Sequence, residues 1–462
     1  MDATQIQQLR PMLNKFLRQF DDCFGRREPV EHLKTYVLGQ LSALPRKSLE
    51  PMADAAGLEP RTLQQFLSLH RWDELRLRDL IQQRISRQQG HELTIAVFDE
   101  TAHAKKGDKT PGVHRQWCGR LGKVENCVVT VHLAYVAGDF HCLIDGELFL
   151  PEAWAADRQR CRKAGIPDTV VHRPKWQIAL EERDRAVANG VRLDWISFDE
   201  NYPMNPEFLF GLDDRGQNYI GEVKRNYMGW LTPPQLLYKR HHQAKGRSGT
   251  FPRVKKKSSP PISLENMLKH SPQLRKLPWE KFYIKDTHKG PMVWEAKTAP
   301  IYLRRNGLPT RPHWLIVTRN VEQPAELKFF LANAPAGTPL EVLLHVAFSR
   351  AHVERCFEDE KSELGLSHFE LRNYRGLCRH LTITALTHLF LAEVHQKWRG
   401  EKSGIDRLPT SHRKFGPGSL VVGVRTSAEK IPGKSGDPYY GDTSTQPASP
   451  PIPFEGQTPT FV

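Results

Sequence analysis

Two short apolar stretches of the sequence each run directly into an aspartate followed by a glutamate. The first, LTIAVFDE, reaches Asp99, and the second, VRLDWISFDE, reaches Asp199 one hundred residues later. Apolar runs rich in β-branched and aromatic residues predict buried strands. A carboxylate at the end of such a strand must be solvated at the sheet edge, paired with a cation or bound to a metal ion.

The rest of the chain predicts a mixed α/β protein that begins with helices. Residues 1–90 place apolar side chains at helical spacing, which predicts a helical region that either binds DNA or packs against the next domain. Residues 91–224 carry the two strands described above, and residues 225–335 predict a β-rich insertion. Residues 336–400 predict two helices. Residues 401–462 hold nine prolines and little apolar periodicity, which predicts disorder.

The charge of the chain points to a polyanionic partner. There are 67 Lys and Arg against 52 Asp and Glu, a formal net charge of +15, and nucleic acid is the first candidate partner. Residues 239–257 hold eight Lys or Arg and no acid. We therefore expect this loop, with Lys255, Lys256 and Lys257 at its end, to contact a DNA backbone.

The cysteines and the apolar runs indicate the cellular location of such a protein. Seven cysteines without a C-x-x-C pair predict reduced, mostly buried thiols and no zinc knuckle. The sequence has no run of 18 apolar residues, and its first twenty residues are polar and charged. We therefore expect a cytoplasmic protein with no membrane partner and no secretory signal.

The segment RAHVERCFEDEK carries the third group of candidate residues. Arg350, Glu354 and Lys361 are spaced by four and seven residues, so a helix places all three on one face. Taken alone, this pattern also fits a solvated face with ordinary pairing between Arg350 and Glu354.

The start and end of the helix that carries this face have clear signals. Thr338 is the predicted N-cap, Pro339 the first helical residue, and Glu341 completes a capping box. We expect the helix to run to Leu364 and to end at Gly365.

Taken in order, these segments resemble the DDE transposases of bacterial insertion sequences. The likeness is to the branch related to insertion sequence 4 and, within it, to the insertion-sequence 701 family. That branch carries Arg-x3-Glu-x6-Lys around its catalytic glutamate, matched here by Arg350, Glu354 and Lys361. Its two aspartates are matched by Asp99 in VFDET and Asp199 in SFDENY.

Further segments of the chain extend the resemblance over roughly residues 35–395. They are GVHRQWCGRLGKVENC, LFLPEAWAADRQRC, LGLSHFELRNYRG and RHLTITALTHLFLA. The chain departs from the wider branch at Ala347, with Phe348 beside it, where the branch usually has a tyrosine three residues before the arginine. Its proline-rich tail also differs from the ending typical of the family.

The resemblance implies an RNase H-like core: a mixed sheet with flanking helices, interrupted by the β-rich insertion and preceded by the helical N-terminal domain. It implies that Asp99, Asp199 and Glu354 are catalytic and hold two Mg²⁺ or Mn²⁺ ions, with Asp99 bridging both and the others holding one each. The chemistry of the residues agrees, because three gathered carboxylates repel one another and hard oxygen ligands select these ions. The implied activity is cleavage of transposon ends and their joining to target DNA.

Neighbouring residues receive roles by the same reasoning. Glu100 and Glu200 follow the aspartates, and strand alternation turns them away, so we expect them to be non-catalytic. His103, His352 and His380 lack partners at ligand spacing, which favours surface or packing roles. The basic residues expected to contact DNA phosphates near the site are Arg350, Lys361, Lys105, Lys106 and Arg115, although the last three also fit an ordinary solvated loop.

The implied partners are double-stranded DNA, as terminal inverted repeats and as target, and a second copy of the chain, since two transposon ends must be paired. A bacterial transposase is expected at the nucleoid. Two alternatives remain open: a domesticated or inactive transposase-derived protein that binds DNA without cutting it, and another RNase H-like nuclease such as a junction resolvase.

Overall fold

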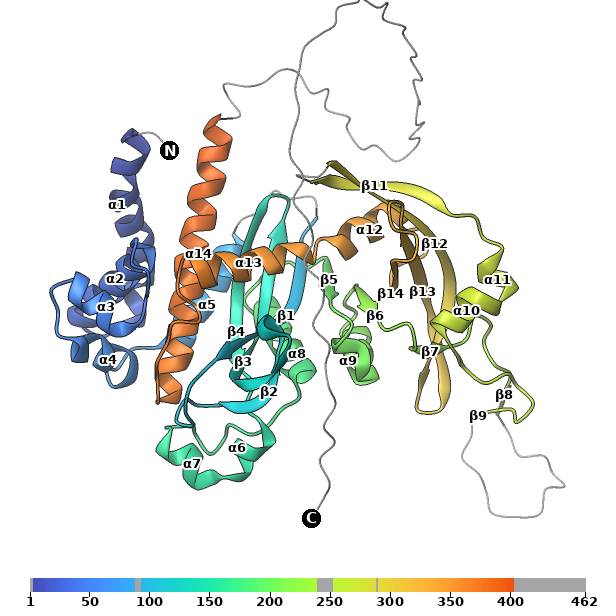
Figure 1. Cartoon of the computed structure of the whole chain (residues 1–462), viewed down its shortest axis with the longest axis horizontal. Helices are drawn as coiled ribbons and strands as arrows, with labels where there is room; N and C mark the ends of the chain where they lie inside the picture. Colours follow the sequence, from blue (N-terminus) through green and yellow to red (C-terminus); the bar gives the residue numbers. More distant parts are fainter. Residues whose placement is uncertain (1–2, 88–92, 239–251, 288–289, 403–462) are drawn as a thin grey trace, which may run out of the picture. The chain divides into compact units, whose positions relative to one another are not determined.

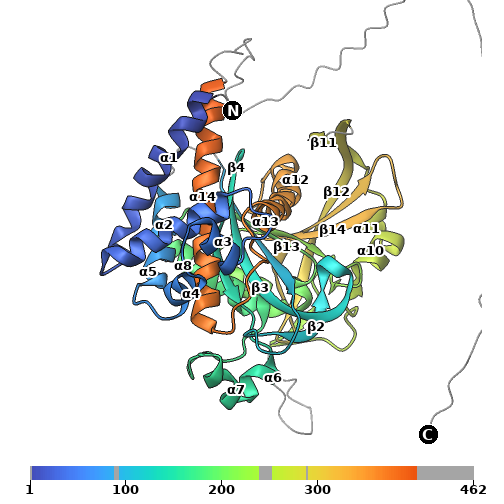
Figure 2. The same ribbon diagram turned by 60° about the vertical axis from the view of Figure 1, so that its left-hand side comes forward.

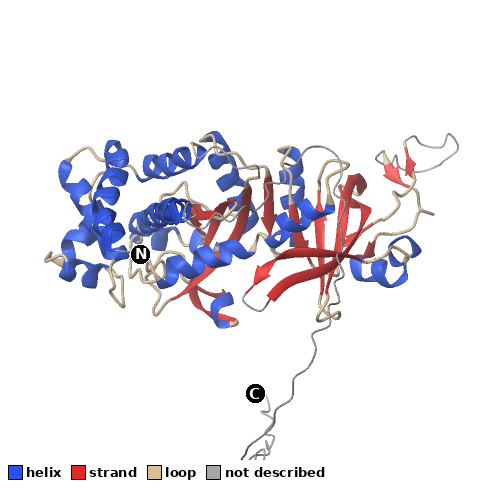
Figure 3. Cartoon of the chain, turned by 90° about the horizontal axis from the view of Figure 1, so that it is seen from above, coloured by secondary structure: helices blue, strands red, loops and turns tan. Residues whose placement is uncertain are grey.

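The computed structural model describes residues 3–87, 93–238, 252–287 and 290–402. These residues form helices and mixed β-sheets, so the predicted α/β class is confirmed (Figures 1 and 3). The predicted disordered tail, apart from its first two residues, and the larger part of the basic loop lie outside the described ranges.

The residues before the first strand are helical, in agreement with their apolar periodicity. They pack along the long helix α14 (Tyr374–Lys402), with which they lie side by side in Figures 1 and 2. The ring of Phe16 lies 5.3 Å from that of Phe390, and the Tyr36 hydroxyl lies 2.8 Å from Nδ1 of His380. The helices are α1 (Ala3–Leu17), α2 (Arg27–Leu41), α3 (Leu49–Ala55), α4 (Pro60–Ser68) and α5 (Glu74–Ser86), with a 3-10 turn at Arg18–Cys23.

A five-stranded sheet follows, and it contains both predicted aspartate strands. Strand β1 pairs antiparallel with β3 on one side and parallel with β5 on the other. Both β2 and β4 pair antiparallel with β3. The strands are β1 (Ile95–Ala104), β2 (His114–Cys118), β3 (Lys123–Ala137), β4 (Phe140–Leu148) and β5 (Trp195–Phe198).

The β-rich insertion forms a second five-stranded sheet that is antiparallel throughout. Its strand order is β11-β12-β13-β14-β6, so β6 from the preceding region closes it. A single parallel bridge between Ile196 and Tyr219 joins the edge of the first sheet to the start of β6. The insertion therefore extends the core. Its strands are β6 (Ile220–Val223), β11 (Glu280–Thr287), β12 (Gly290–Arg305), β13 (Leu308–Asn320) and β14 (Leu327–Ala332).

Shorter elements complete the two parts. Two two-residue ladders, β7 with β10 and β8 with β9, lie in the insertion beside α10 and α11. The bounds are β7 (Met228–Gly229), β8 (Leu236–Leu237), β9 (Arg253–Val254), β10 (Ile262–Ser263), α6 (Glu152–Ala156), α7 (Arg158–Lys163), α8 (Lys175–Ala188), α9 (Pro206–Asp214), α10 (Leu264–His270) and α11 (Pro272–Arg275).

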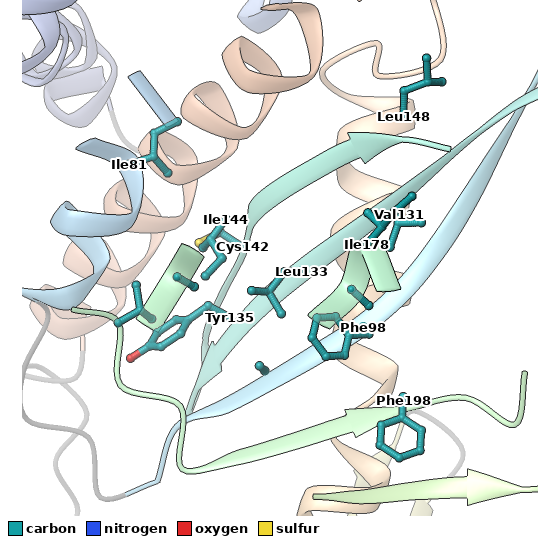
Figure 4. Close-up of a cluster of buried hydrophobic side chains, with 14 of the residues drawn as sticks. Ile81, Phe98, Val131, Leu133, Tyr135, Cys142, Ile144, Leu148, Ile178 and Phe198 are labelled. Atoms are coloured by element: carbon teal, nitrogen blue, oxygen red, sulfur yellow. The ribbon is translucent and has the colours of Figure 1, made fainter. Parts of the chain in front are cut away.

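The hydrophobic core lies against the first sheet and holds its strands in place. Phe98, Leu133 and Cys142 from three neighbouring strands pack with Ile178 of α8 (Figure 4). All seven cysteines are free thiols and six are buried, which confirms the predicted reduced state. Among the described helices, none is long and apolar enough to cross a membrane.

The predicted single helix over residues 338–364 is two helices, α12 (Leu340–Phe348) and α13 (Ala351–Ser362). The break follows from Ser349, whose hydroxyl donates to the His345 carbonyl at 2.7 Å, one turn back. Such back-bonding competes with the helical ladder and bends helices. The helix is predicted to end at Gly365, and α13 ends three residues earlier, at Ser362. Gly365 itself adopts a φ of +75°, a conformation that glycine often takes just after a helix.

The predicted capping box is wrong. Pro339 is the N-cap of α12, and no side chain caps the helix. The Thr338 hydroxyl instead donates to the Pro335 carbonyl at 2.8 Å, so it is committed to the preceding turn. Glu341 is exposed in the first turn of α12.

Candidate active site

Asp99 lies within β1, and the prediction that the strand ends there is wrong. Strand β1 continues to Ala104 because β3 pairs with it along its whole length. The parallel partner β5 pairs only with residues 95–98. Asp99 is thus the first residue of β1 without a strand on that side, and this opening gives its carboxylate access to a cleft.

Asp199 directly follows β5, as predicted. Its carboxylate accepts a hydrogen bond from the Asn201 backbone N–H at 3.0 Å and another from the Asn201 side-chain amide at 2.8 Å. Because β5 runs parallel to β1 and pairs with it up to Phe98, Asp199 emerges at the same edge as Asp99.

Glu354 lies in the first turn of α13 and meets Asp99 through Arg350. The Arg350 guanidinium lies 2.9 Å from the Glu354 carboxylate and 3.5 Å from that of Asp99. The ordinary helical pair between Arg350 and Glu354 therefore exists, but the same arginine also reaches across to β1. The Glu354 side chain remains 59% exposed, which leaves its carboxylate accessible to a ligand.

One cleft of about 770 Å³ brings the predicted residues together. Asp99, Asp199, Glu354 and Lys361 all line it. They come from two strands and a helix that are separated by up to about 260 residues of sequence. The cleft is further lined by Trp117, Arg120, Asn201, Phe357, Glu358 and His368, among others.

The electrostatics of the cleft are those of an undercompensated negative site. Burial, and then the charge of Asp199, raise the pKa of Asp99 to about 7, although Arg350 opposes the shift. Burial and the charge of Arg120 lower the pKa of Lys361, while Asp99 opposes that shift. The position therefore disfavours a charged Asp99, mainly because the carboxyl group is buried.

The donor set fits hard divalent cations. Three carboxylates offer only oxygen ligands, as Mg²⁺ and Mn²⁺ prefer. The ligand oxygens of the three do not all lie within 4.8 Å of one another. The chemistry of these donors, rather than their spacing, is what fits the ions.

The basic residues predicted after Asp99 do not line the cleft. The ammonium of Lys105 donates to the carbonyl oxygens of Ser367 at 3.0 Å and Phe369 at 2.5 Å, and it lies 3.5 Å from the centre of the Phe369 ring. Lys105 therefore ties the end of β1 to the segment after α13. Lys106, in the loop, and Arg115, on β2, are exposed.

The neighbouring glutamates are held differently from the aspartates. Glu100 accepts a hydrogen bond from Lys175 of α8 at 2.5 Å, although it also lines the cleft. Glu200 is exposed and is not among the residues that line the cleft. The position of Glu200 agrees with the expectation that it is turned away, whereas Glu100 is not turned away from the cleft.

The three histidines occupy packed positions, as predicted. His103 is buried between the hydroxyls of Ser367 and Thr130, at 2.9 and 3.0 Å. His380 is buried against the Tyr36 hydroxyl, and His352 packs against the ring of His141 with 5.2 Å between centroids.

The sequence reasoning missed two features of the cleft. Trp117 on β2 is 61% exposed and lines the cleft, and Arg120 lies beside it. A tryptophan within a polar, basic segment was the available signal. At the position of the missing tyrosine, Ala347 is buried and Phe348 packs on Trp294, so neither is among the residues that line the cleft.

Comparison with known proteins supports the reading from the motifs. Residues 19–291 match the model of the family described as DDE superfamily endonuclease. The chain is 26% identical, over 367 residues, to the probable transposase for insertion sequence element IS701 of Microchaete diplosiphon, covering 78% of this chain and 82% of that protein.

Among solved structures, the chain matches the NurA nuclease from Sulfolobus solfataricus with 12% identity over 63% of this chain and 91% of that one. The TM-score is 0.23, which supports no statement about the fold. The family match covers more than half of the chain and includes both aspartates. The chain belongs to the DDE superfamily of endonucleases, and the predicted resemblance to transposases of the insertion-sequence 701 family is confirmed.

Proposed function

We propose that this enzyme is a transposase that cuts DNA at the ends of a mobile element and joins the freed 3′ ends to target DNA. The observation that carries the proposal is the convergence of Asp99, Asp199 and Glu354 in one cleft. Elements distant in sequence supply the three carboxylates, and the family match gives the class of reaction.

We further propose that the core is RNase H-like. The strand order β4-β3-β1-β5, with three antiparallel strands and then a parallel one, supports it. The parallel bridge from β5 to the start of β6 adds a fifth strand on the same side. The first aspartate lies where β1 loses its parallel partner, and the second follows that partner.

In this proposal Asp99, Asp199 and Glu354 would together hold the Mg²⁺ or Mn²⁺ ions. When bound, the ions activate the attacking water or 3′-hydroxyl and stabilise the leaving oxygen of the phosphodiester. Asn201 orients Asp199 through two hydrogen bonds. Arg350 holds Glu354 and Asp99 on facing elements, so its role includes positioning the carboxylates.

Other residues of the cleft are suited to hold DNA. Lys361 and Arg120 offer positive charge to phosphates, and Trp117 offers an exposed aromatic face on which a base can stack. Lys106 and Arg115 are exposed and remain candidates outside the cleft, whereas the ammonium of Lys105 is committed to internal carbonyls. We propose a homodimer on DNA, because joining requires two ends.

The test is a strand-transfer assay with a duplex that carries the terminal repeat found beside the reading frame. We expect Mg²⁺-dependent nicking of this duplex and joining of its 3′ end to a target plasmid. DNA binding without nicking would identify an inactive, DNA-binding descendant. Nicking without joining would identify another nuclease, and either result would overturn the proposal.

A further inference from the structure

A second group of potential metal ligands lies in the helical N-terminal region, away from the candidate active site. Glu28 and His32 are one turn apart on α2, and His70 lies in the loop between α4 and α5. One ligand atom from each of the three lies within 4.8 Å of the others. The elements that carry them appear in Figure 2.

Two nitrogens of this group have no hydrogen-bond partner although they are buried. They are Nε2 of His32 and Nδ1 of His70. The two rings stack with 5.5 Å between centroids and 26° between their planes, so the two imidazoles lie side by side. A buried polar atom without a partner carries a desolvation penalty, and two such atoms side by side indicate a missing ligand.

The loop that carries His70 is held rigidly. Arg379 of α14 is 2% exposed, and its guanidinium donates to the carbonyl oxygens of His70 at 2.8 Å and Trp72 at 2.8 Å. The His70 backbone N–H donates to the Gln65 carbonyl at 2.9 Å. These bonds fix the position of His70 against α2 without using its side chain, as expected of a preorganised ligand.

We propose that Glu28, His32 and His70 form a binding site for a divalent transition-metal ion, with Zn²⁺ as the best match and water as the remaining ligand. Two imidazoles and one carboxylate are the donors that Zn²⁺ accepts, whereas the cleft offers only oxygen. Nε2 of His32 lies 3.6 Å from the Glu28 carboxylate. Zn–N and Zn–O bonds of about 2.0–2.2 Å place tetrahedral ligand atoms about 3.3 Å apart, so the two rings must turn from their stacked arrangement to aim their nitrogens at one ion.

The ion clamps α2 to the loop between α4 and α5. Its role is structural: it joins two segments of the N-terminal helices that also meet here through ring stacking and packing against Phe66. Glu28 is exposed, so the ion enters from the solvent side. Occupancy of this site and of the cleft are independent, because their donors prefer different ions.

The experiment measures Zn²⁺ binding by the full chain after treatment with a chelator, in excess Mg²⁺ so that the carboxylate cleft is occupied. We expect one equivalent of Zn²⁺ to be taken up in competition with a chromophoric chelator, together with a rise in the thermal unfolding midpoint. Co²⁺ in place of Zn²⁺ is expected to give visible absorption bands that report nitrogen ligation.

Matched variants on one helix locate the ion. Glu28→Gln is exposed and leaves the packing intact, so we expect a normal fold and an affinity for Zn²⁺ lower by about tenfold or more. Glu31→Gln, exposed on the same helix, is the control with unchanged affinity. His70→Asn is expected to abolish the binding. Equal binding by wild type and Glu28→Gln, equal loss in Glu31→Gln, or loss in Glu354→Gln instead would overturn the proposal.

Discussion

Two clusters of carboxylates lie on the same sheet, and the structure treats them in opposite ways. In the cleft cluster of Asp99, Asp199 and Glu354, Arg350 pairs with Asp99 and Glu354. The second cluster lies between β4 and α8, and we call it the α8 cluster. It consists of Asp145, Glu147, Glu182, Arg173 and Arg185.

In the α8 cluster, arginines balance the charge of most of the carboxylates. Arg185 donates to Asp145 at 3.0 Å and to Glu147 at 3.1 Å, and Arg173 also pairs with Glu147. Burial alone would raise the pKa of Asp145, but Arg185 and other donors hold it below its ordinary value. In the cleft the pKa of Asp99 moves the other way, to about 7.

This difference in pairing suggests that the α8 cluster serves stability and that the cleft cluster serves function. A buried carboxylate that is paired with an arginine helps to hold the folded structure. Removing this carboxylate leaves the buried cation without its partner. Carboxylates gathered without enough cations destabilise the metal-free protein and mark a site that needs a ligand. The predictions below test this contrast.

The largest expected effect is on catalysis. Asp99→Ala, Asp199→Ala and Glu354→Ala should each lower the rate of Mg²⁺-dependent nicking by on the order of 10³-fold, because each removes a ligand of ions that supply several kcal/mol of transition-state stabilisation. DNA binding in a gel-shift assay should persist in all three variants.

The adjacent glutamates are the controls for this loss. Glu200→Ala is exposed outside the cleft and should nick at the wild-type rate. Glu100→Ala loses its pair with Lys175 and should show at most a small decrease. Wild-type nicking by Asp99→Ala, or an equal loss in Glu200→Ala, would contradict the assignment.

In the α8 cluster the same kind of substitution should unfold the protein more easily. Asp145→Asn leaves Arg185 with Glu147 as its only strong partner and should lower the free energy of unfolding by about 3 kcal/mol. Urea unfolding at neutral pH measures the change. The double variant Asp145→Asn, Arg185→Gln should recover part of it, since no unpaired cation remains.

Asp99→Asn is the matched opposite in the cleft. The folded protein holds the Asp99 proton up to a pH of about 7, whereas the unfolded chain releases it near its ordinary value of about 4. Stability of the metal-free protein therefore falls as pH rises through that window, and Asp99→Asn removes the fall. A lower unfolding midpoint for Asp99→Asn than for wild type above pH 7, without Mg²⁺, would break the comparison.

The sequence predicts some features of the two clusters and not others, and the difference has a physical reason. Asp199 and Glu354 could be proposed as site residues because the local motifs around them resemble those of a known transposase family. The continuation of β1 beyond Asp99 depends on pairing with β3, and the contact of Arg350 with Asp99 depends on where α13 packs. Neither the length of β1 nor this contact can be predicted from the local sequence.

The α8 cluster gave no signal in the sequence. Asp145 and Arg185 lie forty residues apart on a strand and a helix, and each is an ordinary charged residue in its own segment. The same holds for Lys105, which looked like part of a basic loop but donates to carbonyls more than 260 residues further along the chain. Burial and pairing are tertiary properties, so local sequence patterns do not predict them.

Three exposed lysines offer a fourth test, with a smaller expected effect. Lys255, Lys256 and Lys257 are exposed beside β9, and we propose that they contact the DNA backbone. Replacing all three with Ala should weaken binding by roughly tenfold and reduce the magnitude of the slope of log K against log salt by about 2–3, since each phosphate contact contributes about 0.9. An unchanged slope in a salt titration would exclude a backbone role for these lysines.

The smallest expected effect comes from Glu182, which differs from the other carboxylates of the α8 cluster in its pairing. Glu182 is fully buried, and neither of its carboxylate oxygens has a hydrogen-bond partner. Burial, and then the charge of Asp145, raise its pKa well above the ordinary value, so the folded protein holds this proton to a higher pH than the unfolded chain does.

The pH dependence of stability should reveal this proton. The unfolded chain releases it above a pH of about 4.3 while the folded protein retains it, so the stability of the wild type falls as pH rises from there towards the folded pKa. Glu182→Gln keeps the shape and cannot ionise, so urea unfolding at a series of pH values should show a shallower fall and a more stable variant at neutral pH. Identical pH profiles would mean that Glu182 is ionised and paired, and that the α8 cluster is compensated throughout.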